Sequence, residues 1–447
     1  MKLSTAGKIV KGQLKGCNVE FSSVSIDTRT MMPGALFVAL IGEHSDGHQF
    51  IEYAQQAKAV AALVSTPRHQ IDFPQLIVED SARALIALAS FWRKQFHIPI
   101  VGVTGSCGKT TVKSLCESIF KEQASVLVNE KSFNNTLGVP LTLLRLQSHH
   151  QYAILEIGAN HPGEIRSLCN IVKPKVAIIT NAGAAHLEGF GNLDGVARAK
   201  GEIIESLPDS GTVVINLDSP YKNYWQKIAG KRRIITFSTQ TLADIIARDI
   251  QLNSQGEVQF FLQLPNNAHA DIKLPLLGKH NVHNALAAVA AAYSQKIPMV
   301  SIKAGLETIK PATQRLVEYQ GLFGAQIIDD TYNANPLSLN AAIELLSHRA
   351  GRLILVLGDM VELGKKSILF HREAGKKAKA LGIDYLFSYG ELSAHSMKTF
   401  GKNAWHFNDQ IDLIEHLKKQ LDSNTTILVK GSNSMKMNNI ITKLTEV

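Results

Sequence analysis

The chain has 447 residues, of which 45% are hydrophobic and 19% are charged, with a formal net charge of +9 at pH 7. This composition excludes a disordered or low-complexity protein and suits about two to four domains of roughly 100–200 residues each. The densest basic groups, at 231–233 and 376–379, have no aromatic residues interleaved with them, which argues against a nucleic-acid-binding protein. The positive excess suits a smaller anionic partner, such as a substrate that carries a nucleotide.

The cysteines and the N-terminus indicate a cellular compartment. The four cysteines form neither a metal-like pair nor a dense disulfide framework. The first twelve residues lack the apolar core of a signal peptide, and no apolar run approaches the roughly 18 residues of a membrane span. We therefore expect a reduced, cytoplasmic protein without membrane insertion, and a monomer as the simplest state.

Residues 1–96 form the first predicted domain. Apolar runs at 36–40 and 59–64 predict strands, and the stretch 48–58 between them predicts a helix. A further helix is predicted over 81–95, just before a proline that marks the domain boundary. Strand, helix and strand in succession indicate an α/β unit.

Residues 97–311 form the second predicted domain, in which apolar strands alternate with helices. Continuous apolar runs without alternation are typical of a parallel sheet covered on both faces. The predicted strands lie at 100–103, 152–156, 176–180 and 212–216.

Residues 312–447 form the third predicted domain, which repeats the strand–helix–strand pattern of a Rossmann-like α/β fold. A helix is predicted to begin at Asn335-Pro336, because proline is favoured at the first helical position. No G-x-G-x-x-G sequence follows any strand, so the dinucleotide-binding fingerprint is absent from the chain. The predicted strands lie at 326–330, 352–357, 385–388 and 427–429.

A glycine-rich loop joins the strand at 100–103 to a helix whose apolar residues recur at helical spacing. Backbone N–H groups of such a loop, together with the positive end of the helix, hold a polyphosphate. Lys109 can reach the outer phosphates of ATP, and the Thr110 hydroxyl can ligate Mg²⁺. The loop consists of Gly105, Ser106, Cys107, Gly108, Lys109, Thr110 and Thr111.

One position departs from the general phosphate-loop motif. Strict spacing requires glycine at position 103, where Val103 stands, and Gly102 and Gly105 flank it. A tight turn alone explains glycines, but it does not explain a lysine and paired threonines between a strand and a helix. Cys107 lies where a helix N-terminus tends to lower a thiol pKa, yet a tolerated small residue is the simpler interpretation.

This loop and motifs along essentially the whole chain resemble the Mur ligases, the ATP-dependent amide-forming enzymes of peptidoglycan precursor synthesis. The resemblance implies an α/β fold of three domains: a UDP-muramoyl-binding module, a central P-loop domain with a parallel sheet, and a C-terminal Rossmann-like domain. The motifs lie at 25–50, 134–144, 156–165, 180–191, 199–202, 278–284, 329–336, 358–364 and 429–432.

Two of these motifs resemble one member of the family. The runs 158–165 (GANHPGEI) and 329–336 (DDTYNANP) resemble the ligase that joins D-alanyl-D-alanine to UDP-N-acetylmuramoyl-tripeptide. The member that adds the third amino acid is the alternative. Its diaminopimelate-using form typically carries Asp-Asn-Pro-Arg, which this chain lacks, whereas a lysine-adding form stays open. A P-loop NTPase switch or a folylpolyglutamate-type ligase would not need the 25–50 module. A non-catalytic nucleotide-binding protein would survive the loss of Glu156 and Lys200.

Amide formation requires an activated carboxylate. Transfer of the ATP γ-phosphoryl group makes an acyl phosphate, and cations must neutralise the anionic oxygens that meet in such a site. Glu156 ends a strand, where its carboxylate could reach the metal, and His186 follows the next strand, where it could ligate a second ion. A strand-end glutamate is often only solvated and a loop histidine often only caps a turn. Their position beside a phosphate loop favours the functional interpretation.

Further roles are implied by the resemblance alone. From the residues, Lys200 is an exposed helix charge, whereas the resemblance implies a carbamylated lysine that ligates metal. For the adenine base, the resemblance implicates His280 and Asn281. Arg315 and Asp330 would approach ATP from the third domain.

The chain departs from the family pattern at two positions: Gln314 stands where glycine usually precedes the arginine, and Asn433 stands where arginine is usual. The first departure places the local turn geometry in question. The resemblance assigns the incoming dipeptide to Asn333 and Asn335, although a turn and a helix cap would also explain these residues. It assigns the UDP-substrate to Ser25, Asp27, Thr28, Arg29, Asp46, His48, Asn134 and Asn135.

Overall fold

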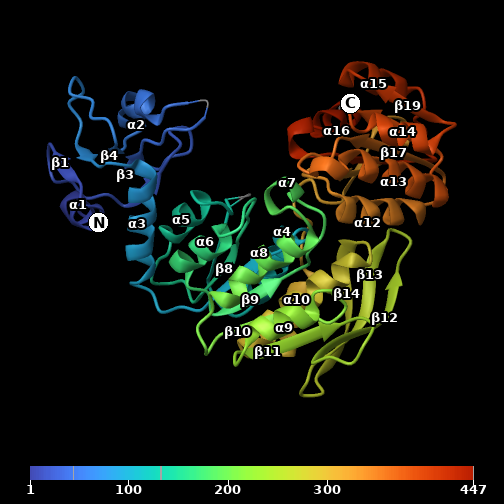
Figure 1. Cartoon of the computed structure of the whole chain (residues 1–447), viewed down its shortest axis with the longest axis horizontal. Coiled ribbons are helices and arrows are strands. Elements are labelled where there is room, and N and C mark those ends of the chain that lie inside the picture. The colour runs from blue at the N-terminus through green and yellow to red at the C-terminus, as the bar shows by residue number, and fades with distance from the viewer. Residues whose placement is uncertain (44, 131–132, 446–447) are drawn as a thin grey trace. The chain divides into compact units, whose positions relative to one another are not determined.

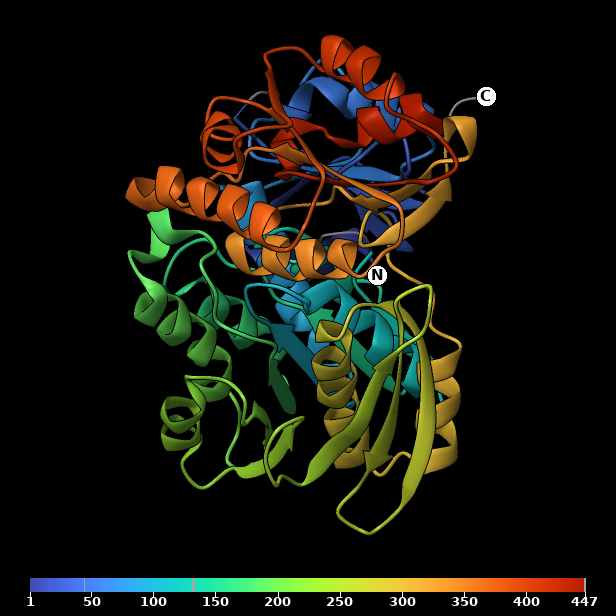
Figure 2. The same ribbon diagram turned by 90° about the vertical axis from the view of Figure 1, so that its right-hand side faces the viewer.

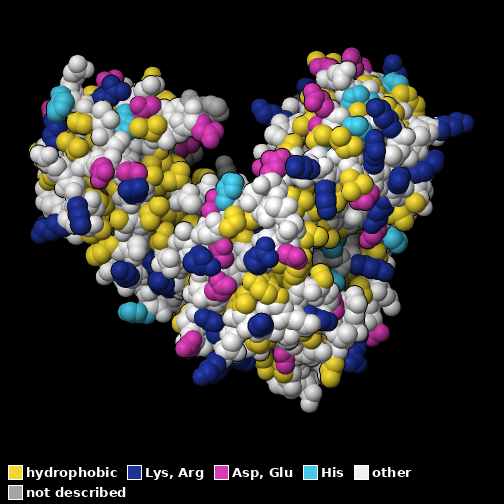
Figure 3. Space-filling model, in the orientation of Figure 1, with side chains coloured by type: hydrophobic (Ala, Val, Ile, Leu, Met, Phe, Trp, Pro, Cys, Tyr) yellow, Lys and Arg dark blue, Asp and Glu magenta, His cyan; other side chains and the backbone are white. Residues whose placement is uncertain are grey.

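The computed structural model describes residues 1–43, 45–130 and 133–445. It is an α/β structure with three β-sheets, and its residues divide into two compact units (Figure 1). No helix in these ranges is long and apolar enough to cross a membrane. On the face drawn in Figure 3, lysine and arginine side chains are interspersed with acidic and uncharged ones. The first unit comprises 1–102, 124–158 and 166–175, and the second 103–123, 159–165 and 176 onward.

The first unit contains a five-stranded sheet in the order β1-β5-β4-β3-β2, with β1 antiparallel to β5 and the others parallel. Neighbouring residues of a strand point to opposite faces. Leu36 therefore packs with Leu85 of α3, whereas Phe37 packs with Ile51 of α2. Both faces are covered, so β3 and β4 are buried throughout. The elements are α1 (Leu3–Val10), β1 (Gln13–Lys15), β2 (Ser23–Ser25), β3 (Ala35–Val38), η1 (Gly47–Phe50), α2 (Ile51–Gln56), β4 (Ala61–Val64), β5 (Gln75–Ile77) and α3 (Ser81–Arg93).

The remaining elements of the first unit lie between residues 98 and 175. β7 and β8 pair in parallel. The backbone N–H of Ala153 donates to Pro99 at 3.2 Å, which places β8 beside the segment that enters β6. β6 begins in the first unit and ends in the second, whereas α6 begins in the second unit and continues into the first. The elements are β6 (Ile100–Thr104), β7 (Val126–Val128), α5 (Gly138–Leu143), β8 (Tyr152–Glu156) and α6 (Glu164–Val172).

In the second unit, the central strands follow the order β14-β13-β12-β11-β10-β9. β9 to β12 are parallel, as predicted for the strands at 176–180 and 212–216. β12, β13 and β14 pair antiparallel and add strands that were not predicted. These three strands form an antiparallel arm beside α10 (Figure 2). The elements are β9 (Val176–Ile179), α7 (Leu187–Phe190), α8 (Leu193–Glu205), β10 (Thr212–Asn216), α9 (Lys222–Ala229), β11 (Arg233–Ser238), β12 (Ile245–Leu252), β13 (Glu257–Gln263), β14 (His269–Leu277), α10 (His280–Ser294) and α11 (Met299–Glu307).

The C-terminal part of the second unit is a six-stranded sheet in the order β15-β16-β20-β17-β18-β19, parallel except for β15. On one face Leu355 packs with Ile343 of α12, and on the other Val356 packs with Leu417 of α15. The elements are β15 (Val317–Gln320), η2 (Leu322–Gly324), β16 (Gln326–Asp330), α12 (Pro336–Ser347), β17 (Arg352–Gly358), η3 (Gly364–Lys366), α13 (Ser367–Ala380), β18 (Tyr385–Tyr389), α14 (Ala394–Phe400), β19 (Ala404–Phe407), α15 (Gln410–Lys418), β20 (Thr425–Lys430), η4 (Asn433–Met435) and α16 (Asn438–Thr445).

A fully buried histidine supports the turn after β17. The Met360 N–H donates to His371 Nε2 at 3.0 Å, and His371 Nδ1 lies 2.7 Å from the Ser367 carbonyl. Because a carbonyl only accepts and an N–H only donates, Nδ1 carries the proton and the ring is neutral. Burial lowers the pKa of His371.

We predict that His371→Ala lowers the thermal midpoint, because it leaves the buried Met360 N–H unpaired at a cost of about 1–3 kcal/mol. As the pH falls from about 7.5 to about 5.5, an unfolded histidine takes up a proton that folded His371 does not, so wild-type stability declines. Thermal midpoints measured across this range should show a weaker decline for the variant. Equal pH slopes for the two proteins would contradict this origin of the acid sensitivity.

Candidate active site

The predicted phosphate loop lies between β6 and α4 (Lys109–Lys121). Gly105 has φ 145° and Gly108 has φ 78°, conformations that favour glycine. A Cβ atom on Gly105 would lie 1.9 Å from the Thr180 hydroxyl, and one on Gly108 would lie 2.5 Å from Asn284 Oδ1. Both glycines are therefore required by the backbone and by close neighbours, as a loop that wraps a phosphate group demands.

The segment after β9 holds this loop in place. The Cys107 N–H donates to Asn181 Oδ1 at 2.9 Å, and the Thr180 hydroxyl donates to the Cys107 carbonyl at 2.5 Å. The hydroxyl of Ser106 donates to the Gly183 carbonyl at 3.0 Å. From the sequence, Thr180 and Asn181 are only part of a family motif, and nothing local in the residue pattern predicts this supporting role. The loop is thus shaped before any ligand arrives, which lowers the entropic cost of binding.

Lys109 and Thr110 lie at the start of α4, as predicted. The Lys109 ammonium donates to the carbonyls of Gly105 at 2.9 Å and Ser106 at 3.3 Å. Arg315 Nη2 donates to the Thr110 hydroxyl at 2.9 Å. Two cationic side chains therefore lie at the end of the helix where anions are favoured.

Gln314 adopts the left-handed backbone that glycine would adopt more easily. Its φ is 60°, and its carbonyl accepts from the Tyr332 N–H at 3.1 Å. The Arg315 guanidinium lies 4.0 Å from the centre of the Tyr332 ring, a cation–π contact. The departure at Gln314 costs roughly 1–2 kcal/mol of backbone strain but keeps the turn that delivers Arg315.

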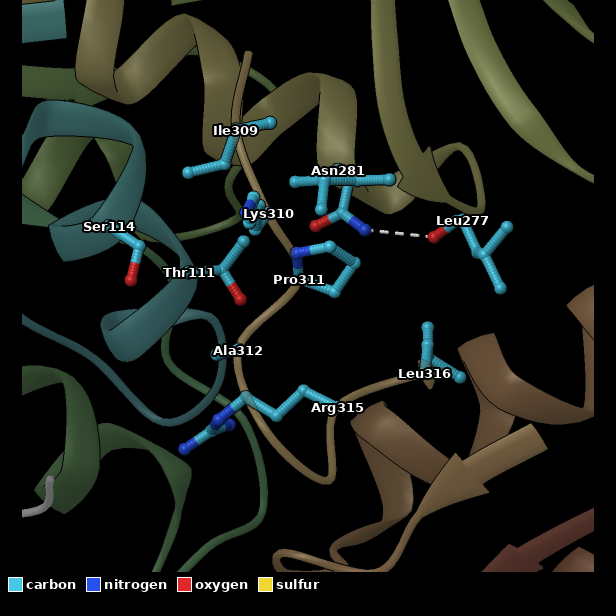
Figure 4. Close-up of a pocket in the computed structure, with 11 residues that line it drawn as sticks. Thr111, Ser114, Leu277, Asn281, Ile309, Lys310, Pro311, Ala312, Arg315 and Leu316 are labelled. Atoms are coloured by element: carbon cyan, nitrogen blue, oxygen red, sulfur yellow. Dashed lines mark hydrogen bonds between the residues drawn. The ribbon is translucent and has the colours of Figure 1, made fainter. Parts of the chain in front are cut away.

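A pocket beside the phosphate loop contains Asn281, one of the two residues predicted for the adenine base (Figure 4). Asn281 Nδ2 donates to the Leu277 carbonyl at 2.8 Å, and its Oδ1 accepts from Asn284 Nδ2 at 2.8 Å. His280 is not among the lining residues, and burial, with the nearby Lys430 charge, lowers its pKa to about 4. The lining residues are Thr111, Ser114, Leu276, Leu277, Asn281, Ile309, Lys310, Pro311, Ala312, Arg315 and Leu316.

Asp330 is the last residue of β16, and Asn333 and Asn335, the two residues predicted for the incoming dipeptide, follow it. Asp330 Oδ2 is 2.5 Å from Lys430 Nζ, a partner that the sequence analysis did not identify. Asn333 is exposed, and its Oδ1 accepts from the Ala334 N–H. Asn335 caps α12 by accepting from the Ser338 N–H at 2.9 Å. This is the helix cap that the sequence predicted as the alternative role of Asn335.

Asn335 also touches the phosphate loop, because its Nδ2 lies 3.0 Å from the sulfur of Cys107. Burial raises the pKa of the Cys107 thiol, which is the opposite of the tendency expected at a helix N-terminus. Asn433, the second departure from the family pattern, donates to the Tyr332 carbonyl at 3.1 Å and so supports the same turn.

His186 and Lys200 occupy the second unit. His186 Nδ1 lies 2.5 Å from Glu362 Oε2, and burial lowers the His186 pKa against the opposing Glu362 carboxylate. Lys200 is 1% exposed and not the solvated helix charge that residue type alone suggests. Its Nζ lies 3.5 Å from the Ala159 carbonyl and 5.0 Å from the Phe190 ring centre. Burial, followed by the charge of Lys109, lowers the Lys200 pKa to about 7.

Glu156 belongs to the first unit and ends β8 as predicted. Its side chain accepts from Asn134 Nδ2 at 2.6 Å, and its backbone N–H donates to Asn129 Oδ1 at 2.6 Å. The structure thus brings Asn134 to Glu156. Asn135 instead accepts from the Gly138 N–H at 2.8 Å, at the start of α5. In the described ranges, no group of three or more His, Cys, Asp and Glu side chains could hold a metal ion.

The N-terminal residues predicted for the UDP-substrate form two local groups. Arg29 makes a two-point ion pair with Asp27, at 2.9 and 2.7 Å, while its side chain stays 86% exposed. Ser25 Oγ accepts from the Asp27 N–H at 3.1 Å, and Thr28 lies in the adjoining turn.

The second group joins Asp46, His48 and the end of β4. His48 Nδ1 lies 2.6 Å from Asp46 Oδ1, and its Nε2 accepts from the backbone N–H groups of Ser65 at 3.0 Å and Thr66 at 3.2 Å. The backbone hydrogen bond from His48 lowers the pKa of Asp46. His48 is therefore a buried ring that supports this loop, while Asp46 stays accessible.

Three family models match the chain. The Mur ligase family catalytic-domain model matches residues 20–93, the Mur ligase middle-domain model matches 103–292, and the Mur ligase glutamate-ligase-domain model matches 314–433. A UDP-N-acetylmuramoyl-tripeptide–D-alanyl-D-alanine ligase of Escherichia coli is 42% identical, covering 99% of this chain and 98% of the relative. The ligase of the same name from Bacillus subtilis is 35% identical over 98% and 97%.

Solved structures agree with these relatives. A crystal structure of MurF from Acinetobacter baumannii has a TM-score of 0.91 and 32% identity, covering 99% of this chain and 98% of that one. MurF of Thermotoga maritima in complex with ADP has a TM-score of 0.81 and 25% identity, over 94% and 96%. The chain belongs to the Mur ligase family.

Proposed function

We propose that this chain is an ATP-dependent ligase that joins D-alanyl-D-alanine to UDP-N-acetylmuramoyl-tripeptide, releasing ADP and phosphate. The observation that carries this function is the convergence of Lys109, Thr110 and Arg315 at the start of α4, beside the pocket that contains Asn281. The names of the relatives support the substrates, and the ADP in the Thermotoga structure supports the nucleotide.

The chemistry proceeds in two steps. The γ-phosphoryl group of ATP moves to the terminal carboxylate of the tripeptide, and the dipeptide amine then attacks the acyl phosphate and releases phosphate. Lys109 and Arg315 neutralise negative charge on the transferring group, which is the largest contribution that a phosphoryl-transfer site makes. We assign Asn281 to the base because it lines the adjoining pocket.

Mg²⁺ fits the residues present. This ion usually keeps several waters and takes one or two protein ligands together with phosphate oxygens, so a dense cluster of carboxylates is not required. The Thr110 hydroxyl has the position and chemistry for one ligand, and Glu156 and His186 are the other candidates. When bound, the ion would supply positive charge to the phosphate oxygens.

Lys200 is the candidate for a carbamate. Its buried amine, with a pKa of about 7, is substantially neutral at physiological pH, and only a neutral amine combines with CO₂. The amine nitrogen bonds to the CO₂ carbon and loses one proton, which converts the neutral amine into an anionic, carboxylate-like metal ligand.

The remaining assignments complete the proposal. We assign the UDP-substrate to the Arg29 and Asp46 groups of an N-terminal domain, residues 1–96, and ATP to a central domain, residues 97–311. We assign the dipeptide to Asn333, in a domain of residues 312–447, because the Asn335 side chain already caps α12. A nucleotide-linked substrate and ATP place the reaction in the cytoplasm, and a monomer is the expected state.

We predict that purified protein with ATP and Mg²⁺ releases phosphate only when both UDP-N-acetylmuramoyl-tripeptide and D-alanyl-D-alanine are present. Phosphate release and the mass of the product, compared between lysine- and diaminopimelate-containing substrates, measure this. Turnover with a single amino acid and UDP-muramoyl-dipeptide would instead assign the preceding step of the family. ATP hydrolysis that does not depend on either substrate would favour a P-loop NTPase.

Lys109→Ala should lower kcat at least 100-fold, because one cation that faces the transferring phosphoryl group is removed. The matched control is Lys121→Ala at the other end of the same helix, whose side chain is 55% exposed and pairs with Glu117 at 2.6 Å. The control should keep wild-type kcat within about twofold. Full activity of the Lys109 variant would remove the phosphate-loop assignment.

Protein equilibrated with ¹³C-labelled bicarbonate should show one carbamate carbon signal that Lys200→Met lacks. The same variant should lose most of its activity if the modified lysine contributes to the metal site. Lys222→Met, which replaces a lysine of the adjoining helix α9, is the control and should keep the signal. Absence of the signal from active wild-type protein would refute the carbamate.

A further inference from the structure

Lys430 lies at the carboxyl end of β20, a place where the sequence analysis recognised a motif but assigned no role to this residue. β16 and β20 are parallel neighbours, and Asp330 and Lys430 face each other at the last position of their register. The Lys430 side chain is 2% exposed. A buried lysine is costly unless its charge is paired, so its partners show what the fold gains from it.

The partners of Lys430 belong to two different functional groups. Its Nζ lies 2.5 Å from Asp330 Oδ2, in the group proposed for ATP. It also donates to the carbonyl of Asn333 at 2.9 Å, in the loop 331–335 proposed for the dipeptide. A single ammonium group therefore connects the Asp330 carboxylate, which we assign to ATP, with the backbone of the 331–335 loop, which we assign to the dipeptide.

The charge of Lys430 also extends to the phosphate loop. Burial raises the pKa of the Cys107 thiol, and the positive charges of Lys109, Lys430 and Arg315 oppose that rise. Burial likewise raises the pKa of Asp330, whereas Lys430 opposes it through its charge and its hydrogen bond. Lys430 thus acts on Asp330 through both its charge and its hydrogen bond, against the effect of burial.

We propose that Lys430 is a positioning residue that orients both the Asp330 carboxylate for ATP and the 331–335 loop for the incoming amine. This inference rests on the proposed function, because it takes the roles of Asp330 and Asn333 from it. The two hydrogen bonds have separable consequences: one reaches the nucleotide through Asp330, and the other reaches the dipeptide through the Asn333 carbonyl.

Three variants separate these consequences. Asp330→Asn removes the anionic carboxylate but leaves the contact from Lys430 to Asn333. It should raise the dissociation constant of a fluorescent ATP analogue at least tenfold and change KM for D-alanyl-D-alanine less than threefold. Lys430→Met, similar in length but uncharged, should raise both quantities at least tenfold and speed hydrogen exchange in 331–335. Lys419→Met, at an exposed position after α15, is the control and should change neither.

The double variant Lys430→Met with Asp330→Asn distinguishes positioning from a merely structural role. It contains no lone buried charge, so its thermal midpoint should return toward the wild-type value. Its ATP-analogue affinity should match that of Asp330→Asn alone, because Lys430 acts on the nucleotide through Asp330. Its KM for the dipeptide should stay as high as in Lys430→Met. A dipeptide KM that recovers together with the thermal midpoint would overturn the proposal.

Two of the measurements, analogue affinity and hydrogen exchange, do not depend on the dipeptide assignment. If wild-type protein failed to join D-alanyl-D-alanine, the proposed function would fall, while analogue affinity and hydrogen exchange would still test Lys430. Wild-type exchange rates in 331–335 of the Lys430→Met protein would then overturn the positioning role. Faster exchange with weakened analogue binding would support it.

Discussion

The contact between Arg315 and the Thr110 hydroxyl is the interaction on which the rest of the site depends. It joins residues 205 positions apart in the chain and brings the segment before β15 to the first turn of α4. Thr110 lies beside the lysine of the phosphate loop, so this contact places a second cation where phosphate charge accumulates. The pocket that contains Asn281 is lined both by residues of α4 and by residues of the segment before β15, the two parts that this contact joins.

Two further contacts in the second unit join the same parts of the chain. His186 Nδ1 contacts the Glu362 carboxylate, and the Cys107 sulfur contacts the Asn335 side-chain amide. Apart from Arg315, which precedes β15, the residues in these three contacts lie in loops at the carboxyl ends of parallel strands or at the helix starts that follow them. The carboxyl ends of parallel strands share one edge of a sheet, which is why ligands of α/β folds gather there. Residues far apart in sequence can therefore act on one nucleotide.

Charge is arranged differently on the surface and at this edge. On the face in Figure 3, basic and acidic groups are interspersed, and such exposed pairs contribute little. Lys200 and Lys430 are instead almost fully buried. Lys430 is paired with Asp330, whereas burial lowers the pKa of Lys200 to about 7. The same residue type is thus paired with a carboxylate in one position and held with a lowered pKa in the other.

Strands and helix ends were predicted correctly where the residues of one element form a recognisable pattern by themselves. The strands at 152–156, 212–216 and 326–330 match β8, β10 and β16, and the cap of α12 at Asn335 was also predicted. The arm of β12 to β14 was missed although β13 alternates buried and exposed residues, the pattern of a strand with one covered face. The single predicted helix at 48–58 divides into η1 and α2.

The sequence by itself determined the fold class, the phosphate loop and the family, because these depend on residue order within one strand, loop or helix. Only the tertiary structure decided which side chains meet. Pairing of Lys430 with Asp330, burial of Lys200 and delivery of Arg315 through the strained turn at Gln314 all depend on segments distant in sequence. Burial and pairing arise from the packing of several elements together, so no local pattern of residues records them.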